Sequence, residues 1–175
     1  FNNESVLVDL IKSEILNNQN LNVNIDLNIK DITNIDELNN LDLTLNFEQG
    51  DITISKSKIF WKDDLEIFLT DAMLNYDDDE IFLLGKLIFN AKNIDDFYKS
   101  FQVKKNDRKK IKQIELDFVY NFNKNNFLFD NIKIDRSSNE KLDKFIEKYN
   151  LNEKKFFNKV TFKNFINEFF ENYDG

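Results

Sequence analysis

The residues from Leu41 to Asn90 read LDLTLNFEQGDITISKSKIFWKDDLEIFLTDAMLNYDDDEIFLLGKLIFN. Apolar and polar residues alternate through most of this segment. The first apolar run consists of Leu41, Leu43, Leu45 and Phe47. A period of two places apolar side chains on one face of a β-strand and polar side chains on the other. Turn signals separate the runs, at 48–51, 62–64 and 77–80. The segment therefore predicts an antiparallel meander with one apolar and one polar face.

The same alternation continues on both sides of the meander. Residues 21–29 form one further run, and a second hairpin is expected around 123–126. The strands of the meander itself are expected at 41–48, 51–61, 64–76 and 80–90. The apolar residues change parity near Asp71, which predicts a β-bulge or a bend. The run 80–90 is apolar on both faces around Gly85, so we expect it at the centre of the sheet or where a helix crosses its back.

Helical spacing occurs at both ends of the chain and once between strands. Residues 4–17 carry apolar residues at helical spacing, a short helix is expected at 94–101, and one or two helical turns are expected within 31–40. After Ser138 the period changes to 3.6, which predicts a helix at 140–149 that Ser138 or Asn139 caps. The last predicted helix has an apolar stripe made of Phe162, Phe165, Ile166, Phe169, Phe170 and Tyr173. Such a stripe is typical of core packing, and less often of membrane or partner binding.

These patterns together predict the fold class α+β, mainly β. We expect a curved antiparallel meander sheet of about seven or eight strands, with short helices and a C-terminal helical pair packed on its apolar face. Residues 1–175 are expected to form a single domain that is the C-terminal fragment of a longer chain, since the sequence starts at Phe1. Its expected parts are a helix at 4–17, a sheet at 21–134 with the short helix 94–101, and a helical tail at 139–173.

The composition disfavours several classes of function. The 175 residues contain no His and no Cys, which removes the usual general base at neutral pH, any thiol nucleophile and the ligand sets typical of zinc sites. A carboxylate-based hydrolase would need two acidic residues that point into one pocket, and the spacing of the acidic residues in the sequence does not identify such a pair. The net charge of −8 argues against sequence-independent nucleic-acid binding. The acidic run 77–80 lacks calcium-loop spacing and is interpreted as a turn. We expect a non-enzymatic protein with no catalytic residue, cofactor, metal or nucleic-acid partner.

The apolar face is larger than the predicted helices can cover. Seven or eight strands would give a face of about 1,100 Å², and three helices of ten to fifteen residues cover around half of it. Either the sheet closes on itself, or an apolar groove stays open for a ligand or for a neighbouring part of a longer chain. The candidate groove residues are Leu41, Leu43, Leu45, Phe47, Leu83, Leu87, Phe89, Leu116 and Phe118.

A basic loop follows the short helix. Its cations stand out in an acidic chain, and clustered cations bind anionic lipid headgroups. A solvated loop after a helix is the plainer interpretation. The candidate headgroup or surface contacts are Lys104, Lys105, Arg108, Lys109 and Lys110.

The order of these elements resembles the later part of AsmA-like proteins, in the set of repeating β-groove proteins that includes TamB and YhdP. The residues that carry the resemblance are the meander 41–90, the helix sequence IDDFYKSF and the hairpin sequence IELDFVYNFNKNNFLFDNIKI. Within them lie a strand ending at Gly50, a strand ending at Trp61 and a strand with Gly85 at its centre. The resemblance spans about residues 21–134. The scarcity of glycine, three in the chain, departs from the family pattern.

The resemblance implies an envelope protein of a Gram-negative bacterium that lies in the periplasm and is attached to the inner membrane through an upstream segment. It implies that the apolar β-groove supports phospholipid transport or outer-membrane assembly. The expected partners are phospholipid acyl chains, the upstream part of the same chain and an envelope protein. The alternative is a sealed structural or protein-interaction module without a lipid ligand.

Overall fold

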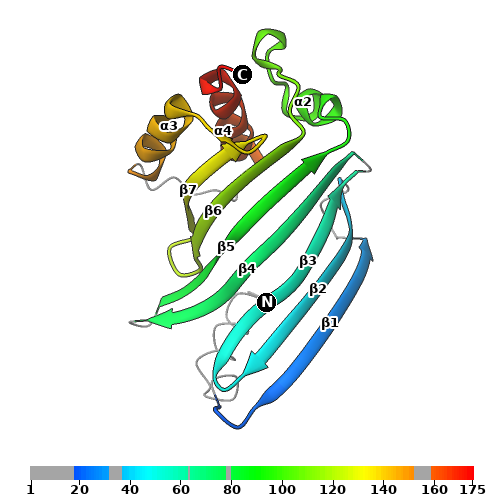
Figure 1. Cartoon of the computed structure of the whole chain (residues 1–175), viewed down its shortest axis with the longest axis vertical. Coiled ribbons are helices and arrows are strands. Elements are labelled where there is room, and N and C mark those ends of the chain that lie inside the picture. The colour runs from blue at the N-terminus through cyan, green and yellow to red at the C-terminus, as the bar shows by residue number, and fades with distance from the viewer. Residues whose placement is uncertain (1–17, 32–36, 63, 78–79, 152–158) are drawn as a thin grey trace.

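The computed structural model describes residues 18–31, 37–62, 64–77, 80–151 and 159–175. The described strands form one eight-stranded antiparallel sheet in which neighbours in sequence are neighbours in space (Figure 1). They are β1 (Asn22–Asp31), β2 (Leu38–Glu48), β3 (Asp51–Trp61), β4 (Leu65–Asp77), β5 (Glu80–Ala91), β6 (Gln113–Asn121), β7 (Asn126–Ile134) and β8 (Ser137–Ser138). The helices are α2 (Asp95–Phe101), α3 (Glu140–Asn150) and α4 (Lys159–Asn172), with a short 3₁₀ turn η1 (Lys105–Asp107).

The predicted fold class and strand order are confirmed. A mainly β, antiparallel meander is followed by two C-terminal helices. The helix expected at 4–17 lies outside the described residues, as do residues 32–36 of the connection 31–40. The helical turns expected there do not include Leu38, which starts β2 and pairs with Trp61 of β3. Ladder hydrogen bonds to β3 override the local helical spacing at this position.

The change of parity at Asp71 is a β-bulge, as the alternation predicts. The register between β4 and β5 shifts between Thr70 and Met73, and Asp71 has a positive φ of 50°. The bulge brings β4 close to Gly85 of β5: a Cβ added to Gly85 would lie 2.9 Å from the Cβ of Ala72. Only glycine fits this close approach without displacing β4.

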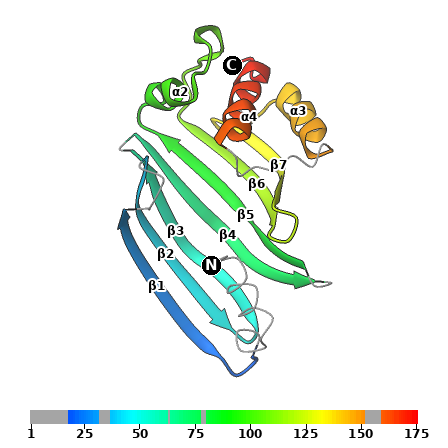
Figure 2. The same cartoon turned by 180° about the vertical axis from the view of Figure 1, so that it is seen from behind.

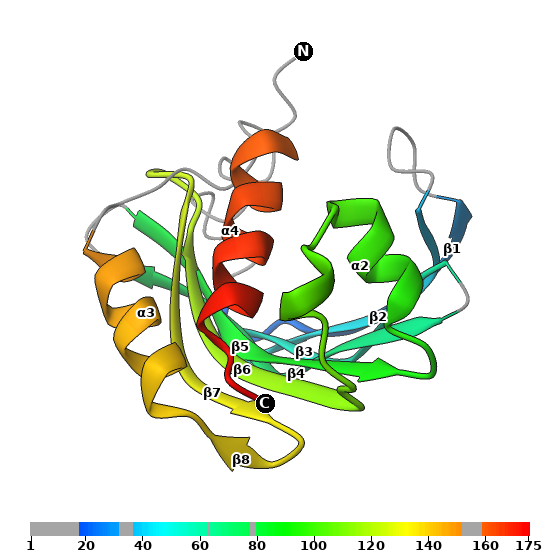
Figure 3. The same cartoon turned by 90° about the horizontal axis from the view of Figure 1, so that it is seen from above.

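The register assigns every strand residue to one of two faces, because residues that are Cα partners share a face. The apolar face carries Leu45, Ile54, Ala72, Phe118 and Phe129 among others, and the polar face carries the residues between them. The sheet is curved, with α2 and α4 on its concave side and α3 beside β7 (Figure 3).

The main core lies between the helices and β5–β7. Among the described residues, eighteen buried ones form it, including Tyr98 of α2, Leu142 of α3 and Phe170 of α4. Phe170 contacts Tyr98 edge-on at a centroid distance of 4.9 Å, and Phe165 of α4 contacts Tyr149 of α3 at 4.8 Å. A smaller cluster of Phe47, Ile52 and Ile81 lies further along the sheet. Most of the burial is therefore concentrated at the C-terminal end.

The outer edge of β7 is capped by polar groups and by α3. The Asn150 side chain donates to the carbonyl of Phe129 at 2.8 Å and accepts from its N–H at 3.1 Å. β8 adds two further pairs to β7, at Lys133 and Ile134. Ser138 and Asn139 were the two expected caps of α3, and Asn139 is the N-cap. Its side chain accepts hydrogen bonds from the N–H groups of Lys141 and Leu142. This edge offers few backbone groups to another strand.

Candidate functional site: an apolar face closed at one end

The nine predicted groove residues lie on one face of the sheet. Leu41, Leu43, Leu45 and Phe47 pair across to β1, and the pairs Leu83–Tyr120, Leu87–Leu116 and Phe89–Ile114 link β5 to β6 on the same face. Gly85 pairs with Phe118, so β2, β5 and β6 contribute to one surface. The period-two alternation therefore placed all nine side chains on the same side of the sheet.

The helices divide these nine residues into two groups. Leu116 and Phe118 are buried in the main core, and Leu83, Leu87 and Phe89 pack against it. The views from behind and from above show α2 and α4 over this end of the sheet (Figures 2 and 3). Side chains in this group pack into the core that these helices and the sheet form. Within the part of the chain that the structure describes, this end of the apolar face is therefore covered by helices.

The β2 group lies in a different environment. Phe47 is buried in the smaller cluster and Leu45 packs against it. Leu41 and Leu43 are partly exposed. Among the described elements, neighbouring strands make the extensive contacts to β1 and β2, and no helix does. This end of the apolar face is the open part of the candidate groove.

The most exposed part of the apolar face is β1. Its inward-facing residues remain 37–40% exposed: Val23, Ile25, Leu27 and Ile29. Four large aliphatic side chains in one row, directly beside Leu41, Leu43 and Leu45, make a continuous apolar strip two strands wide. The nine predicted groove residues did not include these four, although the alternation of residues 21–29 is the signal that identifies them.

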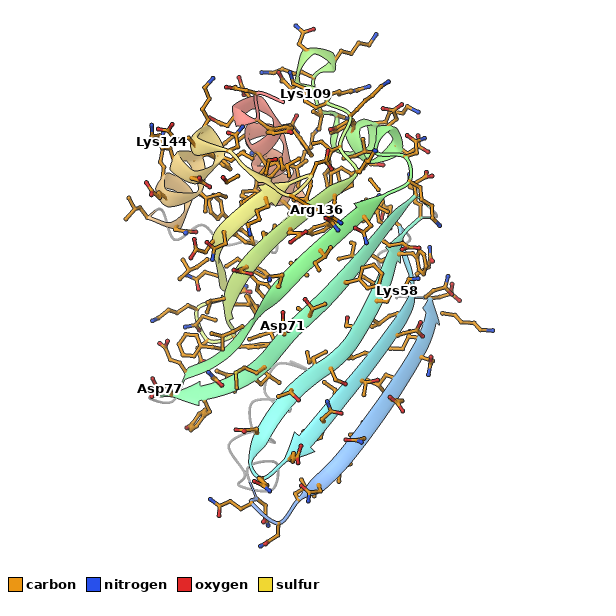
Figure 4. The ribbon with its side chains drawn as sticks, in the orientation of Figure 1. Lys58, Asp71, Asp77, Lys109, Arg136 and Lys144 are labelled. Atoms are coloured by element: carbon orange, nitrogen blue, oxygen red, sulfur yellow. The ribbon has the colours of Figure 1, made fainter. Side chains whose placement is uncertain are left out.

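The basic loop lies beyond α2, at the helical end of the molecule, where Figure 4 labels Lys109. Lys104, Lys105 and Lys110 are exposed, and Lys104 forms an ion pair with Glu171 of α4 at 3.4 Å. Arg108 instead donates from Nε to the carbonyl of Val103 at 2.9 Å. Three of the five predicted headgroup contacts therefore project into solvent, and Arg108 also holds the loop in shape.

Lys109 ties the same loop to α2. Its carbonyl accepts a hydrogen bond from the Tyr98 hydroxyl at 2.8 Å. Burial raises the pKa of Tyr98 to about 12, although the hydrogen bond to Lys109 acts in the opposite direction. Burial also raises the pKa of Tyr149. These hydroxyls stay neutral at physiological pH.

The two described residues of the acidic run 77–80 lie at the ends of neighbouring antiparallel strands. Asp77 and Glu80 are paired at the ends of β4 and β5. Glu80 accepts from Lys124 and Asn121, and these hydrogen bonds lower its pKa. Within the described residues, no group of three or more acidic, His or Cys side chains could hold a metal ion. The turn interpretation agrees with the pairing.

Comparison with family models, with curated proteins and with solved structures finds no match for this chain. Among the described residues, no helix is long and apolar enough to cross a membrane.

Proposed function

We propose that this chain is a non-enzymatic domain of a bacterial envelope protein, and that its open apolar strip supports phospholipid transport or outer-membrane assembly. The proposal places it in the periplasm, attached to the inner membrane through an upstream segment. The observation that carries it is the row of aliphatic side chains on β1, which stay 37–40% exposed beside the leucines of β2. Contiguous apolar surface of this kind marks a binding site for apolar groups.

The dimensions of the strip suit an acyl chain. The apolar row from Val23 to Ile29 spans about 20 Å, at about 3.3 Å per residue of strand. An acyl chain lying along Val23, Ile25, Leu27 and Ile29 would gain about 0.8 kcal/mol for each methylene removed from water. The headgroup would stay in water at the end of the strip, because the basic loop lies at the helical end of the molecule, away from β1. The mechanism needs no chemical step.

The alternative is a sealed structural or protein-interaction module with no lipid ligand. The closed core at β5–β7 favours it, because Leu83, Leu87, Phe89, Leu116 and Phe118 already have protein partners there. In that case the sheet is a scaffold that binds an envelope protein or the upstream part of the same chain. The two functions differ in what is bound to β1 and β2.

Native mass spectrometry of the purified chain, with organic extraction of bound molecules, separates the two functions. Co-purified phospholipid supports lipid handling. The informative variant is Ile25→Asp/Leu27→Asp, which adds two charges to the apolar strip. We expect it to lose the bound lipid and to remain folded, because both side chains are already more than a third exposed.

A matched control is Asn24→Asp/Asn28→Asp, which adds the same two charges to the polar face of the same strand. This variant should keep its lipid. A parent protein that carries no lipid and melts cooperatively would contradict lipid handling and leave the sealed module. Equal lipid loss in both variants would contradict the assignment of the strip as the binding surface.

A further inference from the structure

The polar face of the sheet carries an apolar row that the alternation does not predict. Met73, Leu84, Val119 and Leu128 are Cα partners across β4, β5, β6 and β7. Leu128 is 41% exposed and is among the exposed large apolar residues of the chain. The row runs across the strands on the side opposite the main core. It is therefore separate from the strip on β1 and β2.

Leu84, Val119 and Leu128 of this row lie on the floor of a groove with a volume of about 1000 Å³. The face of α3 that points away from the core supplies one wall, through Asp143 and Glu147, and Asn150 lies at its end. Figure 4 labels Asp71 in the middle of the sheet, which is at the other side of the groove. The groove thus joins an apolar floor to a polar rim.

The rim is acidic. Five carboxylates line the groove, from Asp71, Asp117, Asp130, Asp143 and Glu147, against the amines of Lys86 and Lys133. Asp117 and Asp130 are Cα partners on adjacent strands, an arrangement that destabilises a sheet because like charges lie opposite each other. Lys86 approaches Asp117 only to 4.0 Å, and Asn131 donates to Asp117 at 2.9 Å. A further cation would relieve the repulsion between the two carboxylates.

We propose that this groove is a docking site for a cationic amphipathic helix of a partner protein. The groove extends from Asp71 on β4 to Leu128 on β7, and four strands at a spacing of about 4.8 Å give a length of about 14 Å, which matches a helix of about ten residues. Aliphatic residues on one helix face would contact Leu84, Val119 and Leu128. Lysine or arginine residues on either side would reach the carboxylates of β6, β7 and α3.

The test measures fluorescence anisotropy of a labelled synthetic peptide of about fourteen residues, with leucine at helical spacing and lysine elsewhere. We expect saturable binding that weakens as salt is added, because rim charges are screened. The same peptide with glutamate in place of lysine should not bind, and one with serine in place of leucine should bind more weakly. Equal binding of the lysine and glutamate peptides would overturn the proposal.

Two sets of variants locate the site. Asp130→Lys/Glu147→Lys should weaken binding about tenfold or more, since two attractive charges become repulsive. Glu48→Lys/Asp77→Lys makes the same change in net charge at exposed positions away from the groove and should change the affinity less than about twofold. Leu128→Ser should weaken binding about three- to tenfold by removing part of the floor. Equal losses in the two charge variants would show only a long-range charge effect and overturn the site.

Asp130→Asn separates binding from folding. Relief of the repulsion with Asp117 should leave the melting temperature unchanged or higher, and the affinity for the lysine peptide should fall about threefold. A fall in both would mean that Asp130 is structural and would count against the proposal. The parent chain could also form a dimer that the variant Asp130→Lys/Glu147→Lys dissociates. That result would overturn the partner protein as occupant and assign the groove to the basic loop of a second copy.

Discussion

The two ends of the sheet use the same alternating pattern and reach opposite outcomes. At β5–β7 the residues of the apolar face lie under α2 and α4, where Leu116, Phe118 and Phe129 are buried and the β5 residues are partly buried. At β1 residues of the same kind remain 37–40% exposed. The two edge strands also differ in how far they are covered. α3, β8 and Asn150 cap β7, whereas β1 pairs on one side with β2. Alternation determines which face a residue occupies, and the helices determine whether that face is covered.

The largest expected effect tests this contrast with one substitution at each end. Leu142 is fully buried in α3, and Leu27 on β1 is 37% exposed. Leu142→Ala should lower the free energy of unfolding by about 2–5 kcal/mol, because it leaves a cavity in the main core. Leu27→Ala should cost no more than about 1 kcal/mol, because water already reaches that side chain. Urea denaturation measures both values.

Similar losses at the two positions would break the comparison. They would show that the β1 end is as tightly packed as the β5–β7 end, which would favour the sealed module over the open strip. The denaturant m-value provides the control, since an unchanged slope shows that each variant unfolds as the parent does.

The junction between the two ends gives a smaller effect. Gly85→Ala would place a Cβ 2.9 Å from the Cβ of Ala72 and 3.0 Å from Cδ1 of Leu69, and should cost about 1–3 kcal/mol through overpacking. The reciprocal variant Ala72→Gly should restore room for the new methyl group. The double variant Gly85→Ala/Ala72→Gly should therefore be no less stable than Ala72→Gly alone. A double variant whose cost equals the sum of the single costs would show that the two residues do not compete for the same space.

The sequence predicted well those features that show a pattern among neighbouring residues. The parity change located the bulge at Asp71. The apolar run around Gly85 predicted a position at the centre of the sheet or under a crossing helix, and β5 is the fifth of the eight described strands. Two kinds of feature had no such signal. Asn150 caps β7 from 21 residues away, which no period can show. The row from Met73 to Leu128 depends on the register across four strands, and one bulge in any strand would move it.

The candidate groove shows the same limit. Alternation put all nine residues on one face, but it could not say that Leu116 and Phe118 would be covered while β1 stayed exposed. Coverage depends on where α2 and α4 pack, through contacts such as Phe97 with Phe170 and Phe101 with Phe162. These contacts join residues more than sixty positions apart, and helical spacing identifies the stripe without naming its partner.

The smallest expected effect concerns the two edges of the sheet. Asn150→Ala removes the two hydrogen bonds that cap Phe129 on β7, and should cost about 1 kcal/mol because water satisfies these backbone groups only in part. Asn28→Ala on the exposed polar side of β1 makes the same change of side chain at the other edge and should stay within about 0.5 kcal/mol of the parent. Hydrogen exchange gives the sharper measurement. The Phe129 amide should lose protection in Asn150→Ala, and amides at the centre of β5 should not. If the Phe129 amide keeps its protection, α3 itself excludes water from β7, and the cap contributes specificity of docking rather than protection of the edge.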